Sequence, residues 1–163
     1  MKRIVIFCLL TVLGLRAFAN NESDNVVVKT LAGKKMTFKE VVDGDFVAIL
    51  FWSTTCKPCL NELAALMDIE DKWKGKFRIL AVSVDDARSL AKVKSLANGN
   101  KWKFEVLLDT NKDLYNIYKL TSIPTSIMLN SRGEVVYRHV GYVPNDENIF
   151  VEKALKEAEK ESK

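Results

Sequence analysis

Residues 51–59 read FWSTTCKPC, a cysteine pair directly behind an apolar run. The overlapping residues 47–52 (VAILFW) are continuously apolar, which is typical of a strand buried on both faces, as in a parallel sheet covered by helices. After the pair, apolar side chains recur at the i, i+3, i+4 and i+7 positions of one helix face: Leu60, Leu63, Ala64 and Met67. Pro58 marks the first turn of this helix, where a missing N–H group costs nothing. The stretch therefore joins a buried strand to a helix.

The cysteine pair lies at the start of the predicted helix. Residues three apart in a helical turn have Cβ atoms ~5–6 Å apart, so Cys56 and Cys59 can close a disulfide bond with little adjustment. Cys56 faces the positive end of the helix dipole, which stabilises a partly buried anion by up to ~2 kcal/mol. We therefore predict that the pKa of Cys56 falls from ~8.5 to roughly 6.5–7.5, with a small contribution from Lys57. Cys56 is then the nucleophile, and Cys59 is the resolving thiol.

Two other uses of the pair are less favoured. A structural disulfide across about four residues removes only ~2 kcal/mol of unfolded-state entropy, and a chain of this length buries an adequate core without it. A zinc site needs two more ligands, yet the only other cysteine is Cys8, near the start of the chain, and the single histidine is His139. His139 lies in an alternating, strand-like segment, so we assign it no role and expect no metal.

The chain begins with a segment typical of a signal peptide. Met1-Lys2-Arg3 is basic, residues 4–15 are largely apolar, and Ala17-Phe18-Ala19 offers the small-x-small site that signal peptidase accepts. An uncleaved membrane anchor over residues 4–15 is less favoured, because ~12 residues rise only ~18 Å as a helix, against a hydrocarbon core of ~30 Å. We predict a signal peptide at residues 1–19 and a periplasmic or secreted protein, where an oxidising environment suits a disulfide.

The remaining residues 20–163 are typical of one globular domain. The whole chain is 48% hydrophobic and 28% charged, with only 7 Gly and 3 Pro. Loss of the leader lowers the formal net charge from +4 to +1, because the leader carries three basic residues and no acid. Lysines alternate with acids throughout the rest, so the sequence indicates no nucleic-acid partner.

The other elements alternate along the chain. We predict further strands at residues 26–31, 77–84, 104–108, 125–129 and 134–140, and further helices at residues 87–97, 112–119 and from 145 onward. A turn at residues 131–133 joins the last two strands into a hairpin. This order favours an α/β fold with a mixed central sheet flanked by helices.

Several of these residues together carry a family resemblance. Trp52 precedes Cys56 by four positions, the pair reads Cys-x-Pro-Cys, and Ile123-Pro124-Thr125 follows well downstream. This combination resembles the thioredoxin superfamily and implies a thioredoxin-like fold. Features spread over most of the chain are similar to its TlpA/ResA-like branch of extracytoplasmic thiol-disulfide oxidoreductases: the Gly33 turn, Leu108-Asp109, Tyr118 and residues 132–136.

The resemblance implies further properties of the site. It implies a cis peptide bond before Pro124, which leaves the main chain of Ile123 free to pair with an extended substrate. The expected substrate-binding residues are therefore Ile123, Pro124 and Trp52. It also implies a disulfide reductase for protein substrates, fed with electrons by a membrane thiol-disulfide carrier and in some members serving cytochrome c maturation. The redox-active Cys56–Cys59 disulfide needs no bound metal or organic cofactor, and we expect a monomer.

The sequence departs from the superfamily pattern near the cysteines. Thioredoxins carry a buried acid two residues before the tryptophan, and Leu50 stands there instead. Deprotonation of Cys59 must then rely on another group or on water. Glu62, three residues after Cys59, matches a glutamate common in the branch, but it could equally be a solvated acid on the helix surface.

Two other function classes stay open. A thiol peroxidase of this superfamily carries a proline seven residues before the reactive cysteine and Thr or Ser three residues before it; Ser53 meets the second condition, and Ile49 fails the first. A binding module that kept the fold without catalysis is the other alternative. Consumption of hydrogen peroxide and reduction of insulin distinguish the three.

Overall fold

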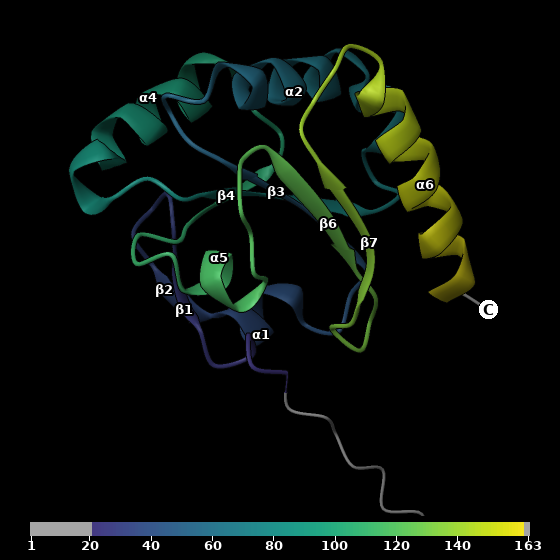
Figure 1. Cartoon of the computed structure of the whole chain (residues 1–163), viewed down its shortest axis with the longest axis horizontal. Coiled ribbons are helices and arrows are strands. Elements are labelled where there is room, and N and C mark those ends of the chain that lie inside the picture. Colours follow the sequence, from purple (N-terminus) through teal and green to yellow (C-terminus); the bar gives the residue numbers. More distant parts are fainter. Residues whose placement is uncertain (1–20, 162–163) are drawn as a thin grey trace, which may run out of the picture.

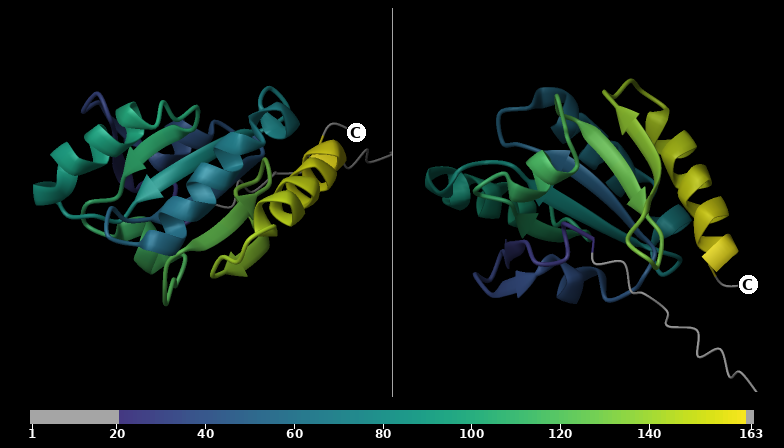
Figure 2. Two further views of the ribbon diagram at one scale, coloured as in Figure 1. Left: turned by 90° about the horizontal axis from the view of Figure 1, so that it is seen from above. Right: turned by 60° about the horizontal axis from the view of Figure 1, so that its bottom comes forward.

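The computed structural model describes residues 21–161, which form one seven-stranded sheet in the order β2-β1-β5-β4-β3-β6-β7 with helices on both faces (Figure 1) (Figure 2). The strands are β1 (Val27–Thr30), β2 (Lys35–Thr37), β3 (Val47–Trp52), β4 (Arg78–Ser83), β5 (Glu105–Leu108), β6 (Thr125–Leu129) and β7 (Val135–Val140). The helices are α1 (Phe38–Val42), α2 (Lys57–Asp68), α3 (Glu70–Trp73), α4 (Leu90–Gly99), α5 (Asp113–Ile117) and α6 (Asp146–Glu161), with a 3₁₀ turn at Ala87–Ser89. The predicted α/β class with a mixed sheet is confirmed.

Strand β3 lies inside the sheet and is buried along its whole length. It pairs in parallel with β4, from Val47↔Arg78 to Trp52↔Ser83, and antiparallel with β6 on its other side. Because strands on both sides and helices on both faces surround it, every residue of β3 has to be apolar, as the VAILFW run is. The prediction of a strand buried on both faces is confirmed.

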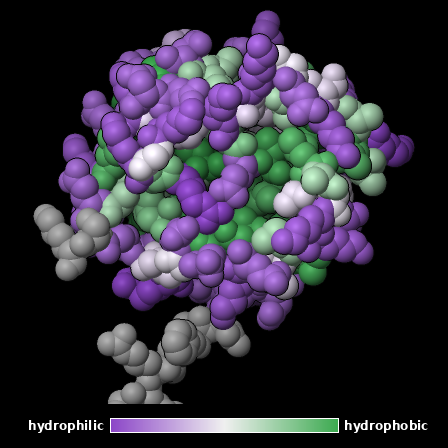
Figure 3. All heavy atoms as spheres, turned by 180° about the vertical axis from the view of Figure 1, so that it is seen from behind, coloured by the Kyte–Doolittle hydropathy of each residue, from purple (hydrophilic) through white to green (hydrophobic). Residues whose placement is uncertain are grey.

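Alternate residues of β3 belong to two separate hydrophobic cores. Ala48, Leu50 and Trp52 face the core that α2, α4 and α6 cover, and Val47, Ile49 and Phe51 face the core that α1 and α5 cover. The rear of the molecule still shows a hollow with apolar side chains between hydrophilic ones (Figure 3). Such partial exposure is ordinary for a domain of this size.

The buried face of α2 differs by about one position from the predicted apolar stripe. Leu63 is buried as predicted, but Ala64 is exposed, and Leu60 and Met67 are half-buried at the edge of the core. The buried residues of α2 are Cys59, Glu62, Leu63 and Leu66. A pattern that counts only apolar side chains could not reveal this orientation, because one member of the buried face is a glutamate.

One short strand and one short helix were not predicted. Residues 35–42 form β2 and α1, and α1 begins with a capping box: Thr37 Oγ1 accepts the Glu40 N–H at 3.2 Å, and Glu40 Oε2 accepts the Thr37 N–H at 2.7 Å. The Thr-x-x-Glu spacing that signals such a box was present in the sequence. The expected helix over residues 87–97 is also divided, into the 3₁₀ turn and α4.

Within residues 21–161, no helix combines the length and the apolar composition that crossing a bilayer requires. The predicted signal peptide at residues 1–19 lies outside the described residues.

Leu63 tests the assignment of the α2 core face. It is 0% exposed, so Leu63→Ala should lower the free energy of unfolding by about 2–5 kcal/mol through lost burial and a residual cavity. Urea unfolding followed by circular dichroism measures this loss. The control is Ile149→Ala, since Ile149 is 56% exposed. Equal unfolding midpoints for the two variants would contradict the assignment.

Candidate active site

The predicted cysteine pair forms a disulfide at the point where β3 passes into α2. The Cα atoms of Cys56 and Cys59 are 5.3 Å apart. Cys56 is half-buried, whereas Cys59 is 1% exposed and packs in the core that includes Leu63. Pro58 lies in the first turn of α2, as predicted. The two sulfurs therefore differ in access, and only the first is open to a large partner.

Cys56 is the N-cap residue of α2. Its backbone is extended, with φ −89° and ψ 94°, and its sulfur accepts the Cys59 N–H at 3.2 Å. This contact places the Cys56 sulfur at the positive end of the helix, where a thiolate is stabilised once the disulfide opens. The first turn of α2 carries no acidic side chain that would repel the thiolate, and Lys57 is exposed.

Asp85 holds the loop that precedes Cys56. Its two carboxylate oxygens accept hydrogen bonds from the backbone N–H and the hydroxyl of Thr54, both at 2.9 Å, and the hydroxyl of Ser83 donates a third at 2.8 Å. Asp85 follows β4, the parallel neighbour of β3, so the two loops meet at one edge of the sheet. Asp85 was not predicted, because an acid just after a buried strand was its only signal in the sequence.

The Ile123–Pro124 peptide bond is cis, as the resemblance implied. The Pro124 carbonyl accepts the Gly141 N–H at 2.9 Å, and the Thr125 hydroxyl donates to the Ser122 carbonyl at 2.7 Å. Thr125 pairs with Phe51 across β6 and β3, which brings this loop to the end of β3 where the cysteines follow. Within residues 21–161, the main chain of Ile123 makes no hydrogen bond, so its polar groups are free.

Trp52 lies beneath the site rather than at its surface. It is 1% exposed and packs edge-to-face on Trp102, with ring centroids 5.0 Å apart. Its indole N–H has no hydrogen-bond partner among the described residues. The enclosed ring supports the loop from below, and the expected contact of Trp52 with the substrate stays a prediction.

Glu62 is buried, which removes the alternative of a solvated surface acid. It is 4% exposed, lies one turn after Cys59 on the same side of α2, and accepts the Ser126 hydroxyl on Oε1 at 2.9 Å. Burial raises the pKa of Glu62 from 4.5 to about 7; the Ser126 hydrogen bond opposes this shift, and the charges of Asp146 and Glu147 add to it.

Glu62 also supplies a buried carboxyl group, which the chain lacks at position 50, where Leu50 stands. Leu50 pairs with Ser126 across β3 and β6, so the side chains of both residues lie on the same face of the sheet. The carboxyl group that the strand lacks at Leu50 thus reaches the same region from the helix, through Glu62 and its hydrogen bond to Ser126. A buried carboxyl group therefore lies one helical turn after Cys59, although it comes from a different element than in thioredoxins.

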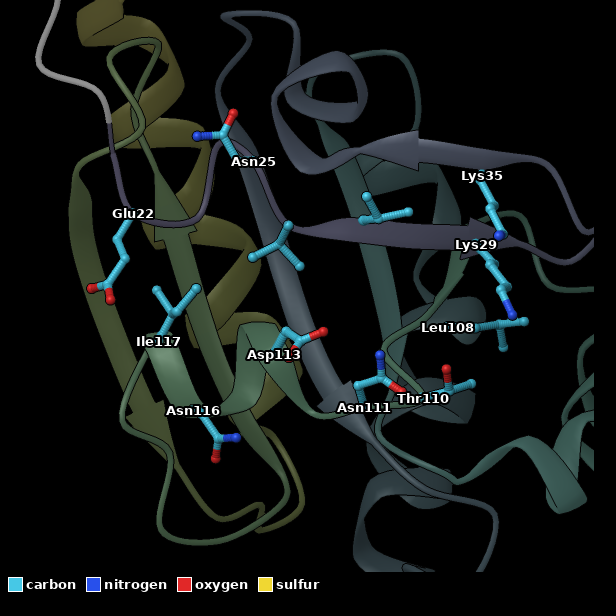
Figure 4. A pocket seen from close by; sticks show the side chains of 12 residues that line it. Glu22, Asn25, Lys29, Lys35, Leu108, Thr110, Asn111, Asp113, Asn116 and Ile117 are labelled. Atoms are coloured by element: carbon cyan, nitrogen blue, oxygen red, sulfur yellow. The ribbon is translucent and has the colours of Figure 1, made fainter.

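A cleft of about 820 Å³ lies away from the cysteines, between β1, β2, the loop after β5 and α5 (Figure 4). Polar side chains line most of it, among them Lys29, Asn111 and Asp113. None of the predicted site residues lines this cleft. At the cysteine site, Cys56 is half-buried and therefore reachable from the surface.

Replacing Glu62 tests its ionisation. A carboxyl group whose pKa rises from 4.5 to about 7 on folding stabilises the fold most below pH 4.5, and this contribution is lost as the pH rises through 7. From acidic to alkaline pH, the free energy of unfolding of Glu62→Gln should therefore rise by about 3 kcal/mol relative to that of the natural protein. Urea unfolding at both pH values measures the gain. Glu152→Gln, an exposed change on α6, is the control; parallel pH curves for natural protein and Glu62→Gln would contradict the buried acid.

The reduced protein tests the thiolate prediction for Cys56. Titration of Cys59→Ser, which leaves Cys56 as the only cysteine of the described domain, should give an ultraviolet thiolate signal with a pKa of roughly 6.5–7.5. The unfolded variant in urea serves as the reference and should titrate near 8.5. If both forms titrate together, the helix terminus does not stabilise the Cys56 thiolate.

Comparisons with known proteins agree with this geometry. The model of the AhpC/TSA family matches residues 19–138. The chain is 34% identical over 121 residues to thiol-disulfide oxidoreductase ResA of Bacillus thuringiensis (strain Al Hakam), covering 74% of this chain and 68% of that protein. It is 31% identical to thioredoxin-like protein YneN of Bacillus subtilis (strain 168), covering 74% and 70%.

A solved structure extends the comparison to the fold. The solution structure of a thioredoxin-like protein from Porphyromonas gingivalis superimposes with a TM-score of 0.72 at 33% identity, covering 86% of this chain and 94% of that one. The thioredoxin-like fold that the resemblance implied is confirmed. The chain therefore belongs to the AhpC/TSA family and, within it, to the ResA-like thiol-disulfide oxidoreductases.

Proposed function

We propose that this protein reduces disulfide bonds of protein substrates outside the cytoplasm, using Cys56 and Cys59 as its dithiol. The observation that carries the proposal is the asymmetry of the pair: an accessible sulfur at the N-terminus of α2 is bonded to a sulfur that is 1% exposed. A purely structural disulfide does not need two sulfurs of unequal exposure. A thiol-disulfide exchange does, because one thiol attacks the substrate while the other stays protected until it resolves the mixed disulfide.

In the first step, the Cys56 thiolate attacks a sulfur of the substrate disulfide and forms a mixed disulfide, while the other substrate sulfur leaves as a thiolate. The N–H of Cys59 stabilises Cys56 before attack. Pro58 keeps the first helical turn in shape, and the exposed ammonium group of Lys57 favours the thiolate weakly, because water screens it.

In the second step, Cys59 attacks Cys56 and releases the reduced substrate. Cys59 is buried as a neutral thiol and first has to lose its proton. Glu62 is the acceptor, because it lies one turn away on the same helix and has a pKa of about 7, so that near neutral pH it can both take and return a proton. A carboxyl group with an ordinary pKa near 4.5 would hold that proton far less readily.

The substrate chain binds beside Pro124. The free main-chain groups of Ile123 pair with an extended substrate segment in the manner of an added strand, and this pairing aligns the substrate disulfide with Cys56. Sequence-independent pairing of this kind suits a reductase that acts on several proteins.

Location and electron supply complete the proposal. The signal-like residues 1–19 support export, and a membrane thiol-disulfide carrier returns electrons to the Cys56–Cys59 disulfide after each turnover. The names of the ResA relatives support the reaction class. We propose a monomer without metal, organic cofactor or nucleic acid, with cytochrome c maturation as one process that it serves.

Insulin reduction tests the reaction class. With dithiothreitol as electron source, the protein should accelerate insulin precipitation, Cys56→Ala should abolish the acceleration, and Cys59→Ala should accumulate mixed disulfides on Cys56 that identify its substrates. Ser53→Ala serves as a control for changes in the same loop. Rapid consumption of hydrogen peroxide without insulin reduction would support a thiol peroxidase instead, and inactivity in both assays would support a binding module.

A further inference from the structure

The Glu62 carboxyl group is closed off from bulk water, although the proposed reaction loads it with a proton in each turnover. Glu62 is 4% exposed, and its hydrogen-bond partner Ser126 is 1% exposed. A proton accepted from Cys59 has to leave before the next cycle. The question is therefore which side chains connect this buried carboxyl group to the solvent.

His139 is the cross-strand partner of Ser126 in the β6–β7 pair. The two residues lie directly opposite each other in the β6–β7 pair, and opposite residues of an antiparallel pair have side chains on the same face with Cβ atoms ~4.5–5.5 Å apart. Tyr137, two residues away on the same face, packs on Phe150 of α6. His139 thus points to the face where α2 and α6 lie.

Asp146 completes a path from this face to the surface. His139 Nε2 lies 3.1 Å from Asp146 Oδ2, and the same oxygen accepts the Val143 N–H at 2.9 Å. The side chains of His139 and Asp146 are 38% and 18% exposed. Exposure therefore rises in steps from Glu62 and Ser126 to the His139–Asp146 pair.

The charges of this region act on Glu62. Asp146 and Glu147, in the first turn of α6, both raise the pKa of Glu62, so they lie close enough to sense its charge. The other titratable groups around it are tyrosines that keep their protons, because the pKa of Tyr142 is raised to about 12 and that of Tyr137 is also raised. Four titratable groups interact with the charge of Glu62, namely Tyr137, Tyr142, Asp146 and Glu147. A fifth, His139, lies opposite its hydrogen-bond partner Ser126. Among them, His139 alone has an imidazole, a side chain that commonly relays protons in proteins, and it is 38% exposed.

We propose that His139 and Asp146 form the proton outlet of Glu62, carrying protons between Ser126 and the solvent. The inference rests on the proposed reductase function, and it assigns a role to the histidine that sequence reasoning left without one. His139 and Asp146 act through Glu62, so they are positioning residues for its proton and not catalytic residues. Asp146 contacts the imidazole at its Nε2 atom, and His139 lies opposite Ser126 in the strand pair.

Protons and electrons balance when Cys59 resolves the mixed disulfide. Cys59 Sγ gives its proton to Glu62 and forms a bond to Cys56 Sγ; the bond between Cys56 and the substrate sulfur breaks, and its electron pair stays on the substrate sulfur. Glu62 then passes the proton by way of Ser126 and His139 to water, and the released substrate thiolate takes a proton from water. No oxidant or reductant beyond the substrate disulfide and the dithiol is consumed.

Single-turnover kinetics on the full chain test the outlet. Reduced protein is mixed with a fluorescent peptide disulfide, and formation and resolution of the mixed disulfide are followed separately between pH 5 and 9. His139→Gln keeps a polar side chain that can contact Asp146 but cannot relay protons. It should slow resolution about tenfold at neutral pH, leave mixed-disulfide formation unchanged, and recover part of the rate when free imidazole is added.

Control variants separate this role from a structural one. Val136→Thr lies on the opposite face of β7, and Glu152→Gln lies on the exposed side of α6; both should resolve the mixed disulfide at the natural rate. Asp146→Asn should resemble His139→Gln. In a Glu62→Gln background, His139→Gln should cause no further slowing, because the group that it serves is gone.

Three results would overturn the outlet. They are an unchanged resolution rate in both His139→Gln and Asp146→Asn, slowing by His139→Gln that persists in the Glu62→Gln background, and slowing by Tyr142→Phe alone, which would assign the path to the tyrosine. A natural protein that forms no mixed disulfide at all would instead refute the proposed function, so the two failures are distinguishable.

Discussion

The burial of β3 on both faces is the constraint on which the site depends. A strand enclosed by β4, β6 and two layers of helices cannot shift along its axis without exposing apolar side chains or losing its register. The loop that follows β3 therefore has a fixed position, in which Asp85 holds Thr54 and Cys56 caps α2. The reactivity of the Cys56 sulfur follows from its position, and the position follows from the core.

The second constraint is a carboxyl group in an apolar setting. Glu62 sits among side chains that disfavour its charged form, and the hydrogen bond that it accepts from Ser126 does not offset that cost. The protein thus holds an easily protonated acid one helical turn after Cys59, the thiol that loses its proton in the proposed mechanism. The charged form of Glu62 lowers the stability of the fold at alkaline pH, while its raised pKa suits proton transfer near neutral pH. Such a combination is common at reactive sites.

The sequence predicted those parts of the molecule that local patterns encode. The apolar run of β3, the Cys-x-Pro-Cys pair and the alternation of strands and helices led to the fold class and the disulfide, and the resemblance led to the cis bond at Pro124. The short β2 and α1 escaped because three to five residues are too few for a periodicity to register. The burial of Glu62 escaped because the apolar stripe was assigned without a polar member. Asp85 escaped because its contact with Thr54 joins loops far apart in the chain, and the His139–Asp146 pair escaped because it depends on how the loop between β7 and α6 folds back.

The indole of Trp52 has a consequence for how this chain can change over evolutionary time. Because its N–H group has no partner in the described domain, the ring contributes volume and edge-to-face packing on Trp102 rather than a hydrogen bond. Replacing Trp52 by another large ring would leave no hydrogen-bond acceptor without its donor. Substitution at this position is therefore limited by the shape of the side chain. Position 52 should thus tolerate substitution by another large ring more readily than Asp85 and Thr54, whose hydrogen bonds hold the reactive loop, tolerate any change.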